Sequence, residues 1–126
     1  MICTMNRSKM SVKRIVSNIA VSSVDDVRKF YSDLFDLDVL MDHGWIVTLG
    51  SGEVAATQIS LATEGGSGTP VPDLSIEVDD VDTIYQRAHE LGHTIVYELT
   101  DEPWGVRRFY LHDPAGKLLN VLSHRT

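Results

Sequence analysis

Residues 16–31 read VSNIAVSSVDDVRKFY, in which a short alternating apolar segment passes at once into a helical pattern. Residues 73–92, DLSIEVDDVDTIYQRAHELG, repeat that order. A shift of 57 residues places apolar residues on one another: Ile19 on Ile76, Val21 on Val78, Val24 on Val81, Val27 on Ile84 and Leu34 on Leu91. Because matches at one fixed shift are typical of internal repeats, the sequence predicts a duplicated module.

Each copy contains a predicted amphipathic helix, over residues 24–35 and residues 81–91. Apolar residues spaced three and four apart form one face of each: Val24, Val27, Phe30, Tyr31 and Leu34 in the first, and Val81, Ile84, Tyr85, Ala88 and Leu91 in the second. Ser23 and Asp80 are suited to cap the two N-termini, and Gly92 to end the second helix in a left-handed conformation. Each helix is expected to cover one face of a sheet.

Three strand-like segments follow each helix, at residues 38–41, 45–49 and 54–61 in the first half and at residues 94–98, 106–112 and 118–123 in the second. Residues 63–72, with three glycines and two prolines, are predicted to link the halves. We therefore expect a tail at residues 1–13 and one α+β domain at residues 14–126. Its βαβββ modules, at about 14–62 and 73–124, would form a curved mixed sheet with a concave cleft.

The whole-chain composition narrows the class of function. The 126 residues are 43% hydrophobic and carry a formal net charge of −7, which disfavours nucleic acid and anionic membranes as partners. Cys3 is the only cysteine, so no disulfide forms within the chain, as in a reducing compartment. The first dozen residues lack the apolar stretch of a secretory signal, and no run approaches the ~18 apolar residues of a membrane helix. A cytoplasmic protein is expected.

Three segments together carry a resemblance to a known family: the two stretches quoted above, and residues 104–121, WGVRRFYLHDPAGKLLNV, with an Asp-Pro-Ala-Gly turn. In order and spacing they resemble the vicinal-oxygen-chelate superfamily of glyoxalases, bleomycin-resistance proteins and extradiol dioxygenases. The resemblance implies the glyoxalase/bleomycin-resistance fold. It also implies a homodimer, because this superfamily usually builds its clefts that way.

Metal-using members of that superfamily place four ligands in the cleft, usually His, Glu or Gln, two from each module. The resemblance puts these positions at Val16, Asp73 and about Gln58 and Asn120. Valine cannot bind a cation, and amide oxygens bind hard cations weakly, which leaves Asp73 as the one charged candidate. Since a catalytic ion usually has at least three protein ligands, we expect no divalent metal and no other cofactor.

Side-chain alternation along the strands predicts the residues that face the cleft. In the two opening strands these are Val16, Asn18, Ala20, Asp73, Ser75 and Glu77. The ligand-binding candidates are Trp45, Gln58, Asp73, Trp104, Arg108, Tyr110, His112 and Asn120.

The tryptophans offer flat apolar faces for a planar ligand, or alternatively anchor a rim or a dimer interface. Arg107 and Arg108, close to Trp104, suit an anionic or aromatic ligand, unless one of them pairs with a surface carboxylate. Four other histidines, His43, His89, His93 and His124, are expected to be exposed or structural.

Three functions remain open. The first is a metal-free binding protein that sequesters a planar or anionic small molecule, similar to the resistance members. The second is a metal-dependent lyase, isomerase or dioxygenase of the same superfamily, or an enzyme that uses Asp73, Tyr110 or His112 for acid–base chemistry. The third is a regulatory module that binds a partner. The sequence favours the first and does not identify the ligand.

Overall fold

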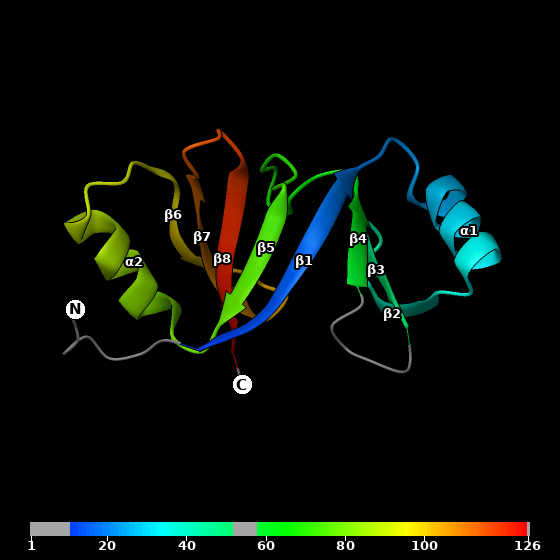
Figure 1. Cartoon of the computed structure of the whole chain (residues 1–126), viewed down its shortest axis with the longest axis horizontal. Helices are drawn as coiled ribbons and strands as arrows, with labels where there is room; N and C mark the ends of the chain where they lie inside the picture. The colour runs from blue at the N-terminus through cyan, green and yellow to red at the C-terminus, as the bar shows by residue number, and fades with distance from the viewer. Residues whose placement is uncertain (1–10, 52–57, 126) are drawn as a thin grey trace, which may run out of the picture.

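The computed structural model describes residues 11–51 and 58–125, which form one curved eight-stranded sheet with two helices (Figure 1). The elements in chain order are β1 (Val12–Ala20), α1 (Val24–Phe35), β2 (Asp38–Asp42), β3 (Ile46–Gly50), β4 (Gln58–Ala62), β5 (Leu74–Val78), α2 (Val81–Glu90), β6 (Ile95–Asp101), β7 (Val106–His112) and β8 (Leu118–His124). The strand order across the sheet is β2-β3-β4-β1-β5-β8-β7-β6. The predicted α+β fold of two βαβββ modules is confirmed.

The two modules meet at the centre of the sheet, where β1 and β5 pair antiparallel (Figure 1). Ser17 lies opposite Leu74 in this pairing, and the same two residues correspond under the 57-residue shift. A pseudo-twofold axis therefore passes between them. Asn18 Nδ2 donates to Ser75 Oγ at 3.0 Å across this axis, between another pair of residues 57 apart. The modules thus pair within one chain.

Both helices begin at the predicted caps. Ser23 Oγ accepts a hydrogen bond from the Asp26 amide at 3.4 Å, and Asp80 Oδ1 accepts one from the Thr83 amide at 3.3 Å. These bonds use backbone donors that would otherwise lack partners in the first turn. After α2, Gly92 adopts the expected left-handed conformation, with φ of 82°.

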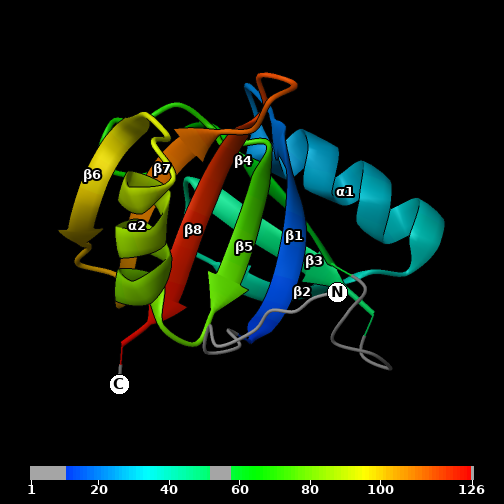
Figure 2. The same cartoon turned by 60° about the vertical axis from the view of Figure 1, so that its left-hand side comes forward.

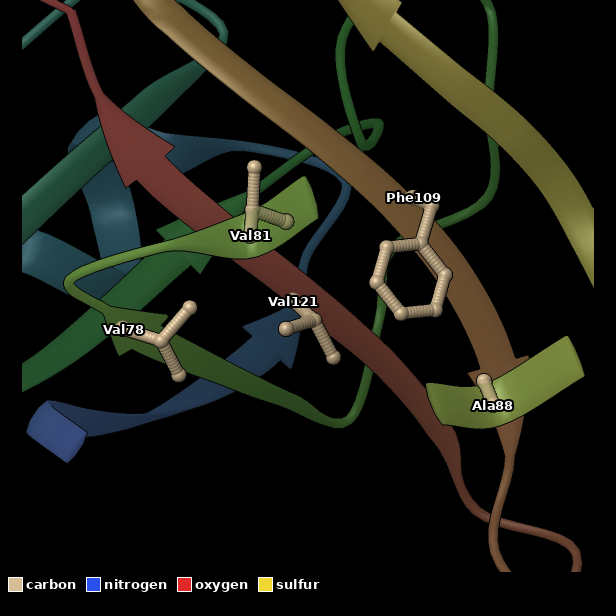
Figure 3. Packing of buried hydrophobic residues seen from close by; sticks show 5 residues of the cluster. All are labelled: Val78, Val81, Ala88, Phe109 and Val121. Carbon is tan, nitrogen blue, oxygen red and sulfur yellow. The ribbon is translucent and has the colours of Figure 1, made fainter. Parts of the chain in front are cut away.

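Each helix covers the outer face of its own half, so α1 and α2 lie at opposite ends of the molecule (Figures 1 and 2). Two separate apolar cores result. One, under α1, contains Val24, Val47, Leu49 and Leu61. The other, under α2, contains Val78, Val81, Ala88, Phe109 and Val121 (Figure 3). Alternate residues of the same strands are left to face the opposite side of the sheet.

The predicted buried face of α1 is wrong in part. Phe30 and Leu34 are 56% and 62% exposed, because α1 packs mainly on β3 and β4, through Val24, Val27 and Tyr31. Leu91 and Ile19, predicted to lie under the helices, are also exposed. The helical pattern identified the helices correctly but overestimated the width of the face that the sheet covers.

Element boundaries differ from the prediction by a few residues. β1 begins at Val12, inside the predicted tail, and β6 continues to Asp101 because it pairs with β7 as far as Arg107. Residues 1–10 of that tail and residues 54–57 of the predicted fourth strand lie outside the described residues. In the part of the chain that the structure describes, no helix is long and apolar enough to cross a membrane.

Candidate functional site

A cavity of about 160 Å³ lies on the face of the sheet that the helices leave uncovered. Both modules line it, since alternate residues of β1, β3 and β4 and of β5, β7 and β8 face it. The link between the modules adds Glu64, Gly65, Val71 and Pro72 to its wall. Its apolar lining consists of Val16, Leu40, Met41, Trp45, Ile46, Ala62, Val71, Pro72, Trp104, Val106 and Leu122. Described residues from both modules of one chain thus line the cavity.

Two tryptophans, one from each module, meet at this cavity. The rings of Trp45 and Trp104 are 5.1 Å apart in an edge-to-face arrangement, and the His43 ring stacks on Trp45 at 6.2 Å. Gly66 packs closely against both indoles: a Cβ atom there would lie 2.5 Å from Trp104 Cη2 and 2.8 Å from Trp45 Cη2. The close approach of Gly66 fixes both rings, so they present a preformed aromatic wall.

Arg108 holds the link between the modules, residues 63–72, through hydrogen bonds to its backbone carbonyls. Its side chain and that of Glu102 are each 3% exposed, and Arg108 Nε donates to Glu102 Oε2 at 2.7 Å. Nη1 donates to the Gly65 carbonyl at 2.6 Å and to Tyr110 Oη at 2.9 Å. Nη2 donates to the Gly66 carbonyl at 3.2 Å and reaches Thr69 Oγ1 at 3.5 Å. All five N–H groups of this guanidinium are therefore engaged within the protein.

The groups around Arg108 complete this buried network. Burial raises the pKa of the Glu102 carboxyl, but hydrogen bonds from Tyr97 and Ser67 and the charge of Arg108 outweigh burial, so this pKa lies below its ordinary value. Burial raises the pKa of the Tyr110 hydroxyl, although Thr69 and the charge of Arg108 oppose the shift. The network therefore holds an ionised carboxylate and a protonated phenol at neutral pH.

The floor of the cavity is polar where the two modules join. Ser75 Oγ accepts hydrogen bonds from Asn18 Nδ2 at 3.0 Å and from Asn120 Nδ2 at 3.1 Å. Nearby, Thr48 and Ser60 share a buried hydrogen bond of 2.7 Å. Among the described residues, Asn120 Oδ1 is buried without a hydrogen-bond partner. The floor thus combines satisfied hydroxyls with one unused acceptor.

A charged cluster borders one end of this floor. Glu77 Oε2 lies 2.7 Å from His124 Nδ1, and Glu77 Oε1 lies 3.2 Å from Arg14 Nε. Arg14 Nη1 also donates to Gln58 Oε1 at 3.1 Å. Arg14 and His124 line the cavity, and Glu77 lies behind them with a side chain that is 15% exposed. The carboxylate is therefore held by one group on each oxygen.

A family model described as a glyoxalase-like domain matches residues 15–124. The chain belongs to the glyoxalase-like domain family. This assignment agrees with the resemblance to the vicinal-oxygen-chelate superfamily. A comparison with curated proteins finds no match.

Several solved structures share the fold of this glyoxalase-like domain. A Legionella pneumophila protein described as an NAD-dependent benzaldehyde dehydrogenase is 17% identical, with a TM-score of 0.71 over 88% of this chain and 99% of its own. A glyoxalase/bleomycin resistance protein/dioxygenase superfamily member from Vibrio splendidus 12B01 is 18% identical, with a TM-score of 0.65 over 90% and 99%. Methylmalonyl-CoA epimerase from Mycobacterium tuberculosis is 17% identical, with a TM-score of 0.64 over 91% and 88%. At these identities the likeness establishes the fold alone.

Four of the eight predicted ligand-binding residues line the cavity of this glyoxalase-like domain: Trp45, Trp104, Arg108 and Asn120. Arg108 lines it without a spare N–H group, as shown above. Arg107 instead pairs with Asp82 and Asp101 on the surface, at 2.9 and 3.0 Å, as the alternative interpretation of the two arginines supposed. The two predicted tryptophans therefore meet in the cavity, whereas both predicted arginines already bind other groups of the protein.

The other four candidates are not among the residues that line the cavity. Gln58 accepts a hydrogen bond from Arg14, which itself lines the cavity, and Tyr110 is fully buried in the Arg108 network. Asp73 Oδ2 accepts from the Leu118 amide at 2.8 Å and so fixes the start of β8. His112 is exposed at the end of β7.

Several residues that line the cavity were not predicted to bind a ligand. Alternation did place Asn18 and Ser75 on the cleft side, and their side chains meet diagonally across the β1–β5 pairing. Thr48 and Ser60 carry no such signal, because they meet only through the β3–β4 pairing, in which they lie opposite each other. His124 was expected to be exposed or structural; it is half-exposed and lines the cavity.

The residues at the family's metal positions do not fit a divalent ion. Val16 has no side-chain ligand atom, Asn120 offers only one weakly binding amide oxygen, and Gln58 and Asp73 are not among the lining residues. Across residues 11–51 and 58–125, no three His, Cys, Asp or Glu side chains come together as a metal site would require. No chemical step of this glyoxalase-like domain is therefore derived through a metal ion.

Proposed function

We propose that this glyoxalase-like domain binds a planar, largely uncharged small molecule in the cavity and does so without a metal ion. The Trp45–Trp104 pair carries the proposal. Its edge-to-face geometry at 5.1 Å leaves ring surface on the wall of a cavity of about 160 Å³, a size that admits a small aromatic molecule. Sequestration of such a molecule, as in resistance proteins of this superfamily, is the function that this geometry supports best.

The charges around the cavity favour an uncharged ligand over an anionic one. Arg108 donates its five N–H groups to protein acceptors, and the charge of Arg14 is offset by Glu77 at 3.2 Å, although the buried Arg14 Nε makes no hydrogen bond to the described residues. Glu64 lines the same cavity and repels anions. A carboxylate ligand would therefore lose its hydration without gaining an unpaired cation.

The metal-free part of the proposal rests on the donor set described above. Stoichiometric zinc, nickel, manganese or iron in the purified protein would contradict it and would favour a metal-dependent lyase, isomerase or dioxygenase instead.

The ligand proposal is tested by calorimetry with two bicyclic probes that differ in charge, 2-naphthol and 2-naphthoate. We expect 2-naphthol to bind and to raise the melting temperature, and 2-naphthoate to bind more weakly. Trp104→Leu should weaken 2-naphthol binding by about ten-fold, since aromatic pairing contributes ~0.5–1.5 kcal/mol beyond the buried area. Tyr85→Phe, on α2 where its ring packs against Phe109 on the outer face of the sheet, is the matched control and should leave binding unchanged. Absence of binding by both probes, or equal binding to Trp104→Leu, would contradict the proposal.

We further propose that the protein is a cytoplasmic homodimer. The resemblance implies a dimer, and the sheet ends in two edge strands, β2 and β6. The exposed Phe30, Leu34 and Phe35 on α1 add apolar surface that a second copy would cover. Light scattering should give about twice the chain mass of 14.0 kDa, and a monomer would count against this.

A further inference from the structure

His124 and Glu77 form a histidine–carboxylate pair beside the cavity. The parallel pairing of β5 with β8 places Glu77 next to Leu122, and His124 is the next residue of β8 on the same face. His124 Nδ1 lies 2.7 Å from Glu77 Oε2. Because an ionised carboxylate only accepts, Nδ1 carries the shared proton, and Nε2 is the ring nitrogen left to accept another.

The surroundings hold this pair in a fixed geometry. Arg14 Nε lies 3.2 Å from the other carboxylate oxygen, and the Glu77 side chain is only 15% exposed. Arg14 and Glu77 are direct neighbours in the β1–β5 pairing, and His124 is the direct neighbour of Val106 in the β7–β8 pairing. His124, Arg14 and Val106 all line the cavity. Residues of four strands, β1, β5, β7 and β8, therefore fix the imidazole at the wall of the space that would hold a ligand.

We propose that His124 is a general base for a ligand bound in this cavity and that Glu77 is its positioning residue. The proposal rests on the proposed binding function and extends it to catalysis. Neither residue occupies a position where metal-using relatives carry ligands, and neither was among the acid–base candidates of the sequence, Asp73, Tyr110 and His112. The substrate class is a planar molecule with an acidic C–H bond.

The proton balance of the step is simple. The C–H bond of the substrate breaks, the proton moves to His124 Nε2, and the electron pair stays on the substrate, where its conjugated system spreads the charge. Glu77 stabilises the resulting imidazolium through the Nδ1–H bond, as a buried carboxylate does for other catalytic histidines. Arg14 shares the same carboxylate and opposes this gain in part through its own positive charge.

The test uses 5-nitrobenzisoxazole, a planar bicyclic probe whose ring opens when a base removes its C–H proton. The electron pair of that bond forms a nitrile while the N–O bond breaks, which releases a coloured 2-cyano-4-nitrophenolate without any co-reactant. We expect the protein to accelerate this reaction with saturation kinetics. His124→Gln should lower kcat by at least about ten-fold, a modest part of the ~10²–10⁴ that a positioned general base contributes.

Matched variants separate catalysis from binding and folding. Glu77→Gln should lower kcat with little change in KM, since it removes the charge that stabilises the imidazolium but no group that lines the cavity. His93→Gln, exposed after α2, should leave both constants unchanged. Equal kcat for His124→Gln and the unaltered protein would overturn the proposal.

A non-reacting analogue, 5-nitroindole, tests binding separately from catalysis. Binding of 5-nitroindole without turnover of 5-nitrobenzisoxazole would overturn the catalytic inference and leave the binding function standing. Failure of both to bind would overturn the binding function and this inference together.

Discussion

Replacement of Arg108 by methionine tests whether the buried ion pair holds the link between the modules in place. The variant keeps a long side chain of similar volume but leaves Glu102 without its cation, and it removes the donors that reach the Gly65 and Gly66 carbonyls. Removing one partner of a buried pair typically costs ~3–5 kcal/mol. Because Ser67 and Tyr97 still donate to Glu102, we expect the lower end, about 3 kcal/mol of unfolding free energy.

Arg107 provides a matched control one residue away. It pairs with Asp82 and Asp101 on the surface, where such pairs contribute about 1 kcal/mol or less. Arg107→Met should therefore cost far less than Arg108→Met. Urea unfolding followed by far-ultraviolet circular dichroism measures both variants without depending on Trp104, which lies 5.0 Å from the Arg108 guanidinium. In thermal melts, about 3 kcal/mol corresponds to a lowering of roughly 10 °C for a domain of this size.

The pH dependence of the same variant distinguishes a lost charge interaction from a simple packing defect. Without Arg108, burial should raise the pKa of Glu102, so that the carboxyl takes up a proton and ceases to be a buried charge as the pH falls. The stability gap between wild type and Arg108→Met should therefore narrow between pH 7 and pH 4. A cost similar to that of Arg107→Met, or a gap that does not change with pH, would refute the reasoning.

Three further predictions concern other parts of the site. Gly66→Ala should destabilise the fold and alter tryptophan emission, because its Cβ would lie under 3 Å from both indoles. Gly44→Ala is the control, since Gly44 has a similar positive φ but open space around it, and it should leave the emission unchanged. Thr48→Val should cost ~1–3 kcal/mol by leaving the Ser60 hydroxyl unpaired, and Ser60→Ala in addition should recover part of that cost in a double-mutant cycle of urea unfolding. The pKa of Glu102 is lowered in the folded protein, so its ionised carboxylate stabilises the fold fully above the unfolded-state pKa of ~4.3. This contribution to the unfolding free energy is lost as the pH falls through the folded-state pKa. An unchanged midpoint of acid unfolding in Glu102→Gln would contradict this.

The duplicated fold is predictable from the sequence because its determinants are local or periodic. Apolar residues repeat at the 57-residue shift, and Ser23 and Asp80 cap helices through bonds to residues three positions later. These signals do not depend on how distant segments meet. The face of α1 that the sheet covers does depend on how distant segments meet, which is why Phe30 and Leu34 were wrongly predicted to be buried.

The candidate site is only partly predictable, since adjacent residues with the same chemistry receive opposite roles. Arg107 and Arg108 point to opposite faces of β7, as alternation requires. The sequence did not show that residues 63–72 fold back over Arg108 and use its donors. Likewise, Glu77 and His124 are 47 positions apart and meet only because β5 and β8 are parallel neighbours.

The chemistry of the cavity resides largely in the parts of the chain that the duplication does not repeat. The pseudo-twofold axis brings Asn18 and Ser75 together at the floor, and a symmetric arrangement of this kind would suit ligands contributed equally by two modules. Val16 and Asp73, however, correspond under the repeat and share no chemistry, so the symmetric positions supply no matched donors. The link at residues 63–72 has no counterpart, yet it fixes Trp45 and Trp104 through Gly66 and occupies Arg108 through its carbonyls. The fold thus supplies the cavity, and the unrepeated link converts it from a polar cleft into an aromatic pocket.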